Sequence, residues 1–173
     1  MKTRIFLFHP DINNQSRANQ ALVNAAKDAG IEVRDEYALY PDFKIDVKAE
    51  QAILEDTDRI IFQFPMYWYS SPALFKEWQD RVLEYGWAYG STGNALQGKE
   101  VILALTQGAK AEDYTINGRF QVTTEELLKP FETIRFHTGL NFMEPFVVSG
   151  ALNLSDSELV KAAQDYVARL TEE

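Results

Sequence analysis

The chain has 173 residues, a formal net charge of −9 and 46% hydrophobic residues. A chain of this length can bury most of its apolar surface without cross-links, so residues 1–173 are expected to form a single domain. The acidic charge argues against nucleic acid as a partner, because phosphate binding needs clustered Lys and Arg.

Residue counts exclude several kinds of site. No cysteine is present, which excludes disulfides, thiolate catalysis and a Cys-type metal site. The two histidines, His9 and His137, lie far apart in the sequence, so we expect no metal site. The start of the chain lacks a signal-peptide layout, and no apolar run approaches membrane-spanning length. These features predict a soluble cytoplasmic protein.

The first third of the chain alternates between strand and helix patterns. Residues 4–8 predict a strand, and residues 9–16 a polar loop. A helix is expected from Arg17, ending at Gly30. Residues 31–39 predict a second strand, at the edge of the sheet because acidic residues interrupt it. A short helix is expected over residues 47–53.

Residues 60–90 carry the strongest pattern in the sequence, a strand followed by an aromatic loop and a helix. An apolar run over residues 60–64, stopped by Pro65, is typical of a buried parallel strand. Three aromatic residues follow, and Ser70 or Ser71 is expected to cap a helix whose first residue is Pro72. Ligands of open α/β sheets bind beyond the carboxyl ends of the strands, where these aromatics would suit a flat ring. Alternatively, they are core or subunit-contact residues.

The second half repeats the pattern. Four glycines between residues 86 and 98 predict an exposed excursion, and residues 101–105 and 142–148 predict two more strands. Capping boxes at residues 123–126 and 155–158 predict two helices. Pro130 is expected to kink the first of these or to restart it. The last helix is expected to bury Leu159, Val160, Ala163, Val167 and Leu170.

Five strands alternating with helices predict an α/β fold with three layers, a parallel sheet between helices on both faces. The glycine fingerprints of dinucleotide-binding and P-loop proteins are missing after the first strand. The first loop instead offers Ser16, Asn19 and a helix start, which suit a single phosphate, although Ser16 serves equally well as a plain helix cap. This combination favours the flavodoxin-like strand order 2-1-3-4-5, with FMN at the switch point.

Residues 62–82, FQFPMYWYSSPALFKEWQDRV, resemble the FQFPxxWxxxPAxxKxWxxRV segment of the flavin-dependent NAD(P)H:quinone oxidoreductases. That family includes modulator-of-drug-activity proteins and ancillary subunits of potassium-efflux systems, and weaker similarity extends from His9 to about Pro145. The resemblance implies two-electron reduction of quinones by NADH or NADPH, with FMN or else FAD as cofactor, in a homodimer. An electron-carrier flavodoxin and a regulatory subunit of a potassium transporter remain alternatives.

The resemblance also implies site residues. Five residues of the first loop and helix would hold the flavin phosphate: His9, Ser16, Arg17, Ala18 and Asn19. Two loops would line the flavin ring: Pro65, Met66, Tyr67, Trp68 and Tyr69 on one side, and Thr106, Gln107, Gly108 and Ala109 on the other. Tyr114 would lie over the ring where quinone and nicotinamide bind, and Tyr114 and Trp68 are the expected catalytic residues.

The sequence departs from the family pattern at two positions. Ala109 replaces a glycine of the family's TTGG loop, which narrows one approach to the ring. Phe120 stands where the mammalian enzymes place a histidine, six residues after the tyrosine. His137 does not replace it and is expected to be a structural residue near a helix end. The aromatic residues between 85 and 89 are a candidate contact with the partner subunit.

Overall fold

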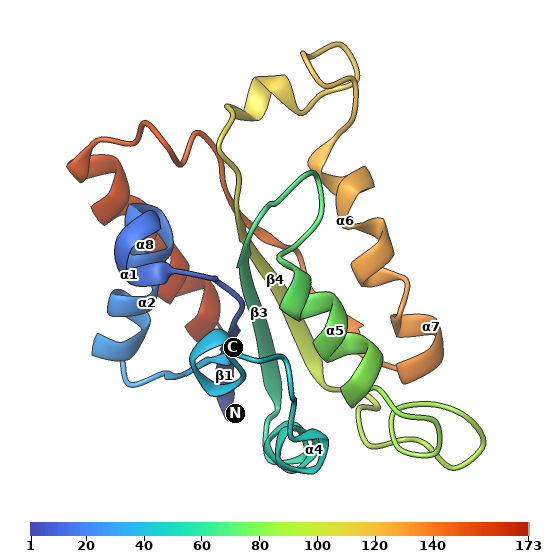
Figure 1. The fold of residues 1–173 in the computed structure, drawn as a ribbon. Coiled ribbons are helices and arrows are strands. Elements are labelled where there is room, and N and C mark those ends of the chain that lie inside the picture. Colours follow the sequence, from blue (N-terminus) through green and yellow to red (C-terminus); the bar gives the residue numbers. More distant parts are fainter. Residues whose placement is uncertain (173) are drawn as a thin grey trace.

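A parallel β-sheet forms the middle layer of the protein (Figure 1). The structure is a computed structural model that describes residues 1–172; Glu173, the end of the expected domain, lies outside the described residues. The strands run in the order β2-β1-β3-β4-β5, with β6 also paired to β4, which confirms the flavodoxin-like prediction. They are β1 (Thr3–Leu7), β2 (Glu32–Asp35), β3 (Arg59–Pro65), β4 (Glu100–Thr106), β5 (Asn141–Phe142) and β6 (Phe146–Val148).

Helices cover both faces of the sheet (Figure 1). They are α1 (Ile12–Gln15), α2 (Arg17–Asp28), α3 (Glu36–Leu39), α4 (Val47–Glu55), α5 (Ala73–Val82), α6 (Thr124–Glu132), α7 (Arg135–Thr138) and α8 (Asp156–Thr171), with a 3-10 turn at Ala111–Asp113. Helices α2 and α8 bury Leu22 and Tyr166 against one face, while α5 buries Trp78 and Phe75 against the other. Each face therefore has its own apolar core.

Alternation along β1 divides its side chains between the two cores. Ile5 and Leu7 belong to the core under α2 and α8, whereas Phe6 and Phe8 belong to the core under α5. This is the two-residue period of a strand with both faces covered. Strand β3 is buried over its full length. The turn that follows it therefore starts from a fully packed strand.

The expected second strand over residues 31–39 is wrong in its second half. Strand β2 ends at Asp35, whose side chain accepts the N–H of Ala38 at 3.1 Å and caps the short helix α3. The cap competes with strand pairing, because a carboxylate that bonds a backbone N–H three residues later favours a turn of helix. The strand does lie at the sheet edge, as expected.

The expected last strand over residues 142–148 is two strands. Strand β5 ends at Phe142 and β6 begins at Phe146. Both pair with β4, at residues 100–101 and 104–106 respectively. Pro145 lies in the gap, and its lack of an N–H removes one ladder bond there.

Helix starts are confirmed at two sites and corrected at a third. The capping boxes Thr123/Glu126 and Ser155/Glu158 are both present. Helix α5 begins one residue later than expected, with Pro72 as its N-cap and no side-chain cap from Ser70 or Ser71.

Two expectations about helix interiors need correction. Pro130 was expected to kink or restart the helix; it does not restart α6, which continues to Glu132, and the kink stays a prediction. Pro130 is exposed, so the carbonyl that loses its N–H partner there can bond water instead. In α8, Val160 is 57% exposed and Tyr166 is buried instead, because residues 159, 163, 166 and 170 form one helical stripe. No helix among the described residues is long and apolar enough to cross a membrane.

Candidate active site

The loop between β1 and α2 collects hydrogen-bond donors around the start of α2. The backbone N–H groups of Arg17 and Ala18 bond no acceptor within residues 1–172. Such orphan N–H groups at a helix start attract anions. The guanidinium of Arg17 contacts the Leu154 carbonyl at 3.1 Å and Asp156 at 2.7 Å, and Ala18 is buried, so Ala18 offers only its backbone.

His9 adds a further donor next to this helix start. Its side chain is buried, and burial lowers the imidazole pKa more than the carboxylates of Asp11 and Asp35 raise it. The Nδ1 atom accepts the N–H of Asp11 at 3.0 Å, so the neutral ring carries its proton on Nε2. Nε2 bonds no other described residue, and its N–H is therefore available to a ligand.

Ser16 and Asn19 are tied to each other. The Oγ of Ser16 accepts the backbone N–H of Asn19 at 3.1 Å and its side-chain Nδ2 at 3.0 Å. The Asn19 amide is fully buried and also bonds Thr106 Oγ1 at 2.9 Å and Gln63 Nε2 at 3.1 Å. The side-chain donors of Asn19 are therefore used within the protein, whereas the hydroxyl proton of Ser16 is not.

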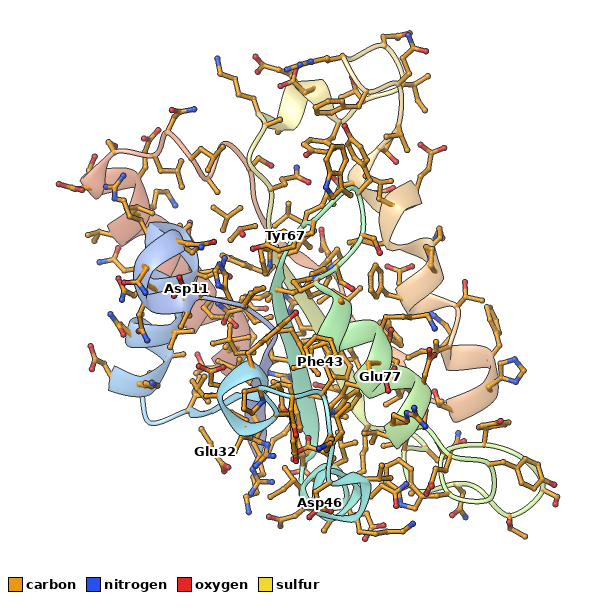
Figure 2. The ribbon with its side chains drawn as sticks, in the orientation of Figure 1. Asp11, Glu32, Phe43, Asp46, Tyr67 and Glu77 are labelled. Atoms are coloured by element: carbon orange, nitrogen blue, oxygen red, sulfur yellow. The ribbon has the colours of Figure 1, made fainter. Side chains whose placement is uncertain are left out.

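The aromatic residues after β3 form a tight two-residue turn. Tyr67 and Ser70 exchange backbone hydrogen bonds at 3.3 and 3.0 Å, while Trp68 and Tyr69 have φ values of +48° and +62°. These values describe a type I′ turn, which bulky residues adopt only at a cost in strain. The N–H groups of Trp68 and Tyr69 have no partner among the described residues. Figure 2 places Tyr67 beyond the end of β3, on the same edge of the sheet as Asp11.

The loop over residues 106–109 faces this turn across the ends of β3 and β4. Gln107 is buried and braces the loop: its Nε2 donates to Ser149 at 2.8 Å and its Oε1 accepts from Thr124 at 3.1 Å. The N–H groups of Gly108 and Ala109 bond no acceptor in the part of the chain that the structure describes. A Cβ on Gly108 would lie 3.1 Å from the side chain of Leu152, so the backbone passes close to that residue.

A pocket of about 240 Å³ opens between the two loops. Its lining residues are Met66, Trp68, Tyr69, Gly108, Ala109, Tyr114, Phe120 and Leu152. The structure therefore brings together the turn after β3, the loop after β4 and Tyr114, as the resemblance implied. Leu152, from the segment between β6 and α8, has no local signal in the sequence that could have indicated this position.

Three aromatic side chains close one side of the pocket. The ring centroid of Phe120 lies 4.9 Å from that of Tyr114 and 5.4 Å from that of Tyr69. Burial, and then the nearby Tyr69 and Asp113, raises the pKa of Tyr114. Its hydroxyl is therefore protonated at neutral pH and can donate a hydrogen bond to a ligand.

Four residues expected at the ring do not line the pocket: Pro65, Tyr67, Thr106 and Gln107. Pro65 is buried at the end of β3, whereas Trp68 lines the rim of the pocket and is 92% exposed. The residues expected to hold the phosphate do not line the pocket, and the hydrogen bond between Asn19 and Thr106 connects them to the loop after β4. His137 is an exposed residue in the last turn of α7, away from the pocket, which agrees with a position near a helix end.

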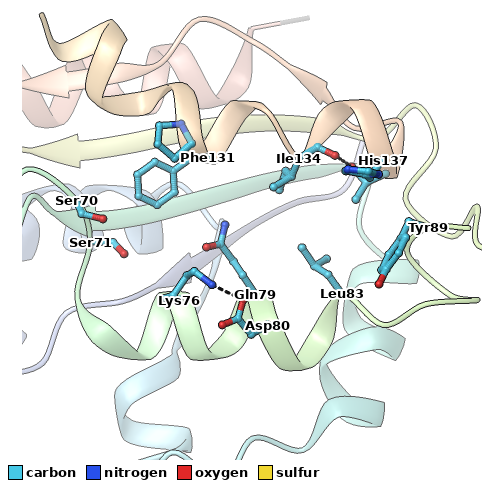
Figure 3. A pocket seen from close by; sticks show the side chains of 12 residues that line it. Ser70, Ser71, Lys76, Gln79, Asp80, Leu83, Tyr89, Phe131, Ile134 and His137 are labelled. Carbon is cyan, nitrogen blue, oxygen red and sulfur yellow. Dashed lines mark hydrogen bonds and ion pairs between the residues drawn. The ribbon is translucent and has the colours of Figure 1, made fainter.

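A second and larger hollow, of about 750 Å³, separates α5 from α6 and α7 (Figure 3). Lys76 and Asp80 form an ion pair on the α5 side. On the facing side lie Phe131 of α6, His137 of α7 and Ile134 from the turn between these helices. Ser70 and Ser71 line the end nearest the aromatic turn, and Tyr89 lines the other end. We call this hollow the α5–α7 groove.

Comparison with known sequences places the chain among flavodoxin-like proteins. A family model described as flavodoxin-like fold matches residues 1–170. An uncharacterized NAD(P)H oxidoreductase, YrkL, of Bacillus subtilis (strain 168) is 44% identical over 174 residues, covering 100% of this chain and 99% of the relative. The glutathione-regulated potassium-efflux system ancillary protein KefF of Enterobacter sp. (strain 638) is 38% identical, covering 96% of this chain and 93% of the relative.

Solved structures agree on the fold. General stress protein 14 of Treponema denticola, in complex with FMN, superposes with a TM-score of 0.92 at 38% identity, covering 98% of each chain. An NADPH-quinone reductase of P. pentosaceus gives 0.88 at 27% identity, covering 100% of this chain and 99% of that one. A protein described as a thermophilic tryptophan halogenase from Streptomycin violaceusniger gives 0.94 at 44% identity, covering 98% and 99%. These names differ in chemistry, but the chain belongs to the flavodoxin-like fold family that includes the NAD(P)H oxidoreductases and the potassium-efflux ancillary proteins.

Proposed function

We propose that this protein is an FMN-dependent NAD(P)H:quinone oxidoreductase. The observation that carries the proposal is the convergence, at one edge of the sheet, of an anion cradle and an aromatic pocket. The cradle consists of the His9 Nε2 and the free N–H groups that start α2. The pocket lies between the loops after β3 and β4. A phosphate and a flat ring of one ligand match these two parts.

The donors present fit a flavin. His9, Arg17 and Ala18 would hold the phosphate, because a dianion gains most from several N–H donors and a helix start. The free N–H groups of Trp68, Tyr69, Gly108 and Ala109 would meet the polar edge of the ring. Asn19 would act indirectly, by holding Ser16 and Thr106. FMN is favoured over FAD, because a solved structure at 38% identity is in complex with FMN.

The bound flavin would supply the two-electron chemistry, and this chain's residues would bind, orient and exclude water. Tyr69, Tyr114 and Phe120 lie on one side of the pocket, so both substrates are expected to approach the bound ring beside these three side chains. NAD(P)H and the quinone would therefore use the same place in turn. The protonated hydroxyl of Tyr114 would donate a hydrogen bond to the quinone oxygen, on which negative charge develops.

We also expect a homodimer whose interface includes the α5–α7 groove. Tyr85 and Tyr89, in the glycine-flanked excursion before β4, are 69% and 36% exposed, and Tyr89 lines the groove. Trp87, which we expected to be exposed with them, instead packs on the core and donates to Glu55 at 2.7 Å. Exposed aromatic surface beside a groove favours coverage by a second copy. The groove reaches Ser70 and Ser71, so the partner would approach the aromatic turn.

The purified protein tests the proposal directly. An absorption spectrum and chromatography of the released flavin should show FMN, and NADH or NADPH should reduce a soluble benzoquinone without a separate reductase. A protein that takes up neither FMN nor FAD would exclude the enzyme. Bound flavin that NADH and NADPH fail to reduce would instead indicate an electron-carrier flavodoxin. A cytoplasmic location, where NAD(P)H is available, belongs to the same proposal.

The likeness to the Enterobacter ancillary protein favours a second function, regulation of a potassium-efflux transporter. Co-purification of the tagged protein with a membrane transporter would support it. A chain that never associates with a transporter but reduces quinones rapidly would leave only the enzyme.

A further inference from the structure

A chain of buried polar side chains connects α8 with the start of α2. The hydroxyl of Tyr166 donates to Gln63 Oε1 at 3.0 Å, and Gln63 Nε2 donates to Asn19 Oδ1 at 3.1 Å. Asn19 Nδ2 then donates to Ser16 Oγ at 3.0 Å and Thr106 Oγ1 at 2.9 Å. Tyr166, Gln63 and Asn19 are completely buried. Hydrogen bonds offset the cost of burying these groups but add little stability over an apolar set of the same shape.

The backbone carbonyl oxygen of Asn19 shows which end of each side-chain amide in this series of hydrogen bonds is the donor. Gln63 Nε2 also lies 3.4 Å from the backbone carbonyl oxygen of Asn19. A carbonyl oxygen only accepts, so this end of the Gln63 amide is its NH2 group. The oxygen end must then accept from Tyr166, and the oxygen of Asn19 must accept from Gln63. The NH2 group of Asn19 is consequently turned toward Ser16 and Thr106.

Because the Asn19 amide donates to Ser16 and Thr106, the protons of these two hydroxyl groups must point away from Asn19. Ser16 Oγ accepts two hydrogen bonds from Asn19, which fill both of its lone pairs. Its proton can only be donated away from Asn19, and no described residue accepts it. Thr106 Oγ1 likewise accepts from Asn19 and donates to none of residues 1–172. Ser16 precedes the free N–H groups of Arg17 and Ala18, so its hydroxyl is a donor at the anion cradle.

We propose that Tyr166 is a positioning residue that acts through Gln63 and Asn19 to hold the Ser16 hydroxyl as a donor to the flavin phosphate. The inference rests on the proposed function, because it takes the anion to be the phosphate of FMN. Without the Tyr166 hydroxyl, the Gln63 oxygen loses its 3.0 Å hydrogen bond, and only the long 3.4 Å contact with the Asn19 carbonyl still opposes reversal of the amide. If the amides of Gln63 and Asn19 are both reversed, Asn19 Oδ1 faces Ser16 and Thr106, and both hydroxyl groups donate to it. Ser16 would then present a lone pair to the phosphate.

Riboflavin provides the discriminating probe, because it has the ring of FMN and lacks the phosphate. Dissociation constants of both flavins are measured by fluorescence quenching for the wild type, Tyr166→Phe and Tyr40→Phe. Tyr40 is the matched control: its buried hydroxyl donates to Glu50 at 2.6 Å, outside this chain of bonds. Tyr166→Phe should weaken FMN about tenfold and riboflavin less than about twofold, the loss of one charge-assisted hydrogen bond. Tyr40→Phe should leave the ratio of the two constants unchanged.

The ratio separates positioning from stability, since a partly unfolded apoprotein weakens both ligands equally. In a Ser16→Ala background, Tyr166→Phe should no longer affect the ratio, because the hydroxyl it orients is gone. Gln63→Met breaks the same chain one step nearer the ligand and carries the same expectation if Tyr166→Phe does not fold. Equal weakening of both flavins, or no change in either, would overturn the inference. A wild type that binds neither flavin would overturn the proposed function itself, and the inference with it.

Discussion

The rings of Tyr114 and Phe120 pack against each other with their centroids 4.9 Å apart and their planes at 49°. Phe120 also has the guanidinium of Arg119 5.4 Å from its ring centroid, so the ring is held from more than one side. The position that the family resemblance assigns to a histidine is therefore occupied by an apolar, fixed ring. Three pocket-lining side chains can donate a hydrogen bond: the hydroxyls of Tyr114 and Tyr69 and the indole N–H of Trp68 on the rim. Tyr114 is the most buried of the three.

Substitution of Phe120 by histidine should add a titrating group to the pocket. We expect Phe120→His to introduce an inflection near pH 6.5 into the pH profile of quinone turnover, while the dissociation constant of FMN changes less than about threefold. Acid help from a side chain is typically worth about 10²–10⁴-fold where it is used. Phe120→Leu is the apolar control and should keep the wild-type profile. Phe120→Ala should widen the pocket and raise the KM for quinone.

Removal of the Tyr114 hydroxyl should reduce quinone turnover. Tyr114→Phe keeps the ring contact with Phe120 but loses one hydrogen bond, which predicts a decrease of about tenfold in kcat/KM for quinone. His137→Ala should leave the same value within about twofold, since His137 lies outside the pocket. A small effect at Tyr114 together with loss of activity at His137 would show that the site residues are wrongly assigned.

The shared place proposed for NAD(P)H and quinone beside Tyr114 predicts that the two substrates bind in turn. Initial rates measured against NAD(P)H at several fixed quinone concentrations should give parallel double-reciprocal lines. Intersecting lines would mean that both substrates bind together, which would contradict the proposed shared place beside Tyr114. Dead-end inhibition gives an independent check, because a quinone analogue that binds without reacting should compete with NAD(P)H.

Exposed Tyr85 and Tyr89 predict a dimer interface, and a single charged residue placed there should weaken the dimer. Wild-type protein should sediment as a dimer at micromolar concentration, and Tyr85→Glu should shift it toward the monomer. Val160→Glu is the matched control, because Val160 is also exposed, at 57%, but lies on the face formed by α2 and α8. A fully active, flavin-loaded monomer of the wild type would contradict the expected interface.

Glu36 and Glu50 compete for one arginine inside the core under α5. Both carboxyl groups are fully buried, and both bond Arg34, Glu36 through Nε at 3.3 Å. Glu50 also accepts from Tyr40 at 2.6 Å and Trp78 at 3.0 Å, whereas Glu36 Oε2 lacks a donor among the described residues. Burial, and then the charge of Glu50, raises the pKa of Glu36 to about 9. Glu36 is therefore protonated at neutral pH.

This raised pKa predicts that the protein loses stability as the pH increases. The folded chain keeps the proton up to about pH 9, while the unfolded chain releases it near 4.5, so unfolding releases a proton in between. The free energy of unfolding should then fall by about 1.4 kcal/mol per pH unit across this window from this group alone. Glu36→Gln should remove this slope and make the protein more stable than the wild type at pH 8.

Urea denaturation at pH 5, 6.5 and 8 measures the effect. Glu112→Gln is the control, because the Glu112 side chain is exposed and should leave the slope unchanged. If Glu36→Gln shows the wild-type dependence on pH, the buried proton is not on Glu36.

Local signals in the sequence determined most of the elements. The turn after β3 and both capping boxes could be predicted because their hydrogen bonds join residues three positions apart. Strand β3 could be predicted because its apolar run is continuous, which is typical of a strand buried on both faces. Alternation of strands and helices predicted the parallel sheet, and the polar first loop without a glycine fingerprint predicted the strand order, which is confirmed. The end of β2 and the gap before β6 could not be predicted, because an Asp cap and a proline compete there with apolar patterns.

The site residues divide in the same way. Loops after β1, β3 and β4 must meet at one edge of a parallel sheet, so the sequence alone indicated which segments form the site. Only the tertiary structure decided which hydrogen-bonding groups of these segments bond other residues and which remain available to a ligand. Asn19 joins Thr106 and Gln63 across 87 and 44 residues, and Tyr166 joins Gln63 across 103. A lone glutamine inside a buried apolar strand was the one available signal of this chain of bonds. Its partners depend on packing between distant elements, which no local spacing records.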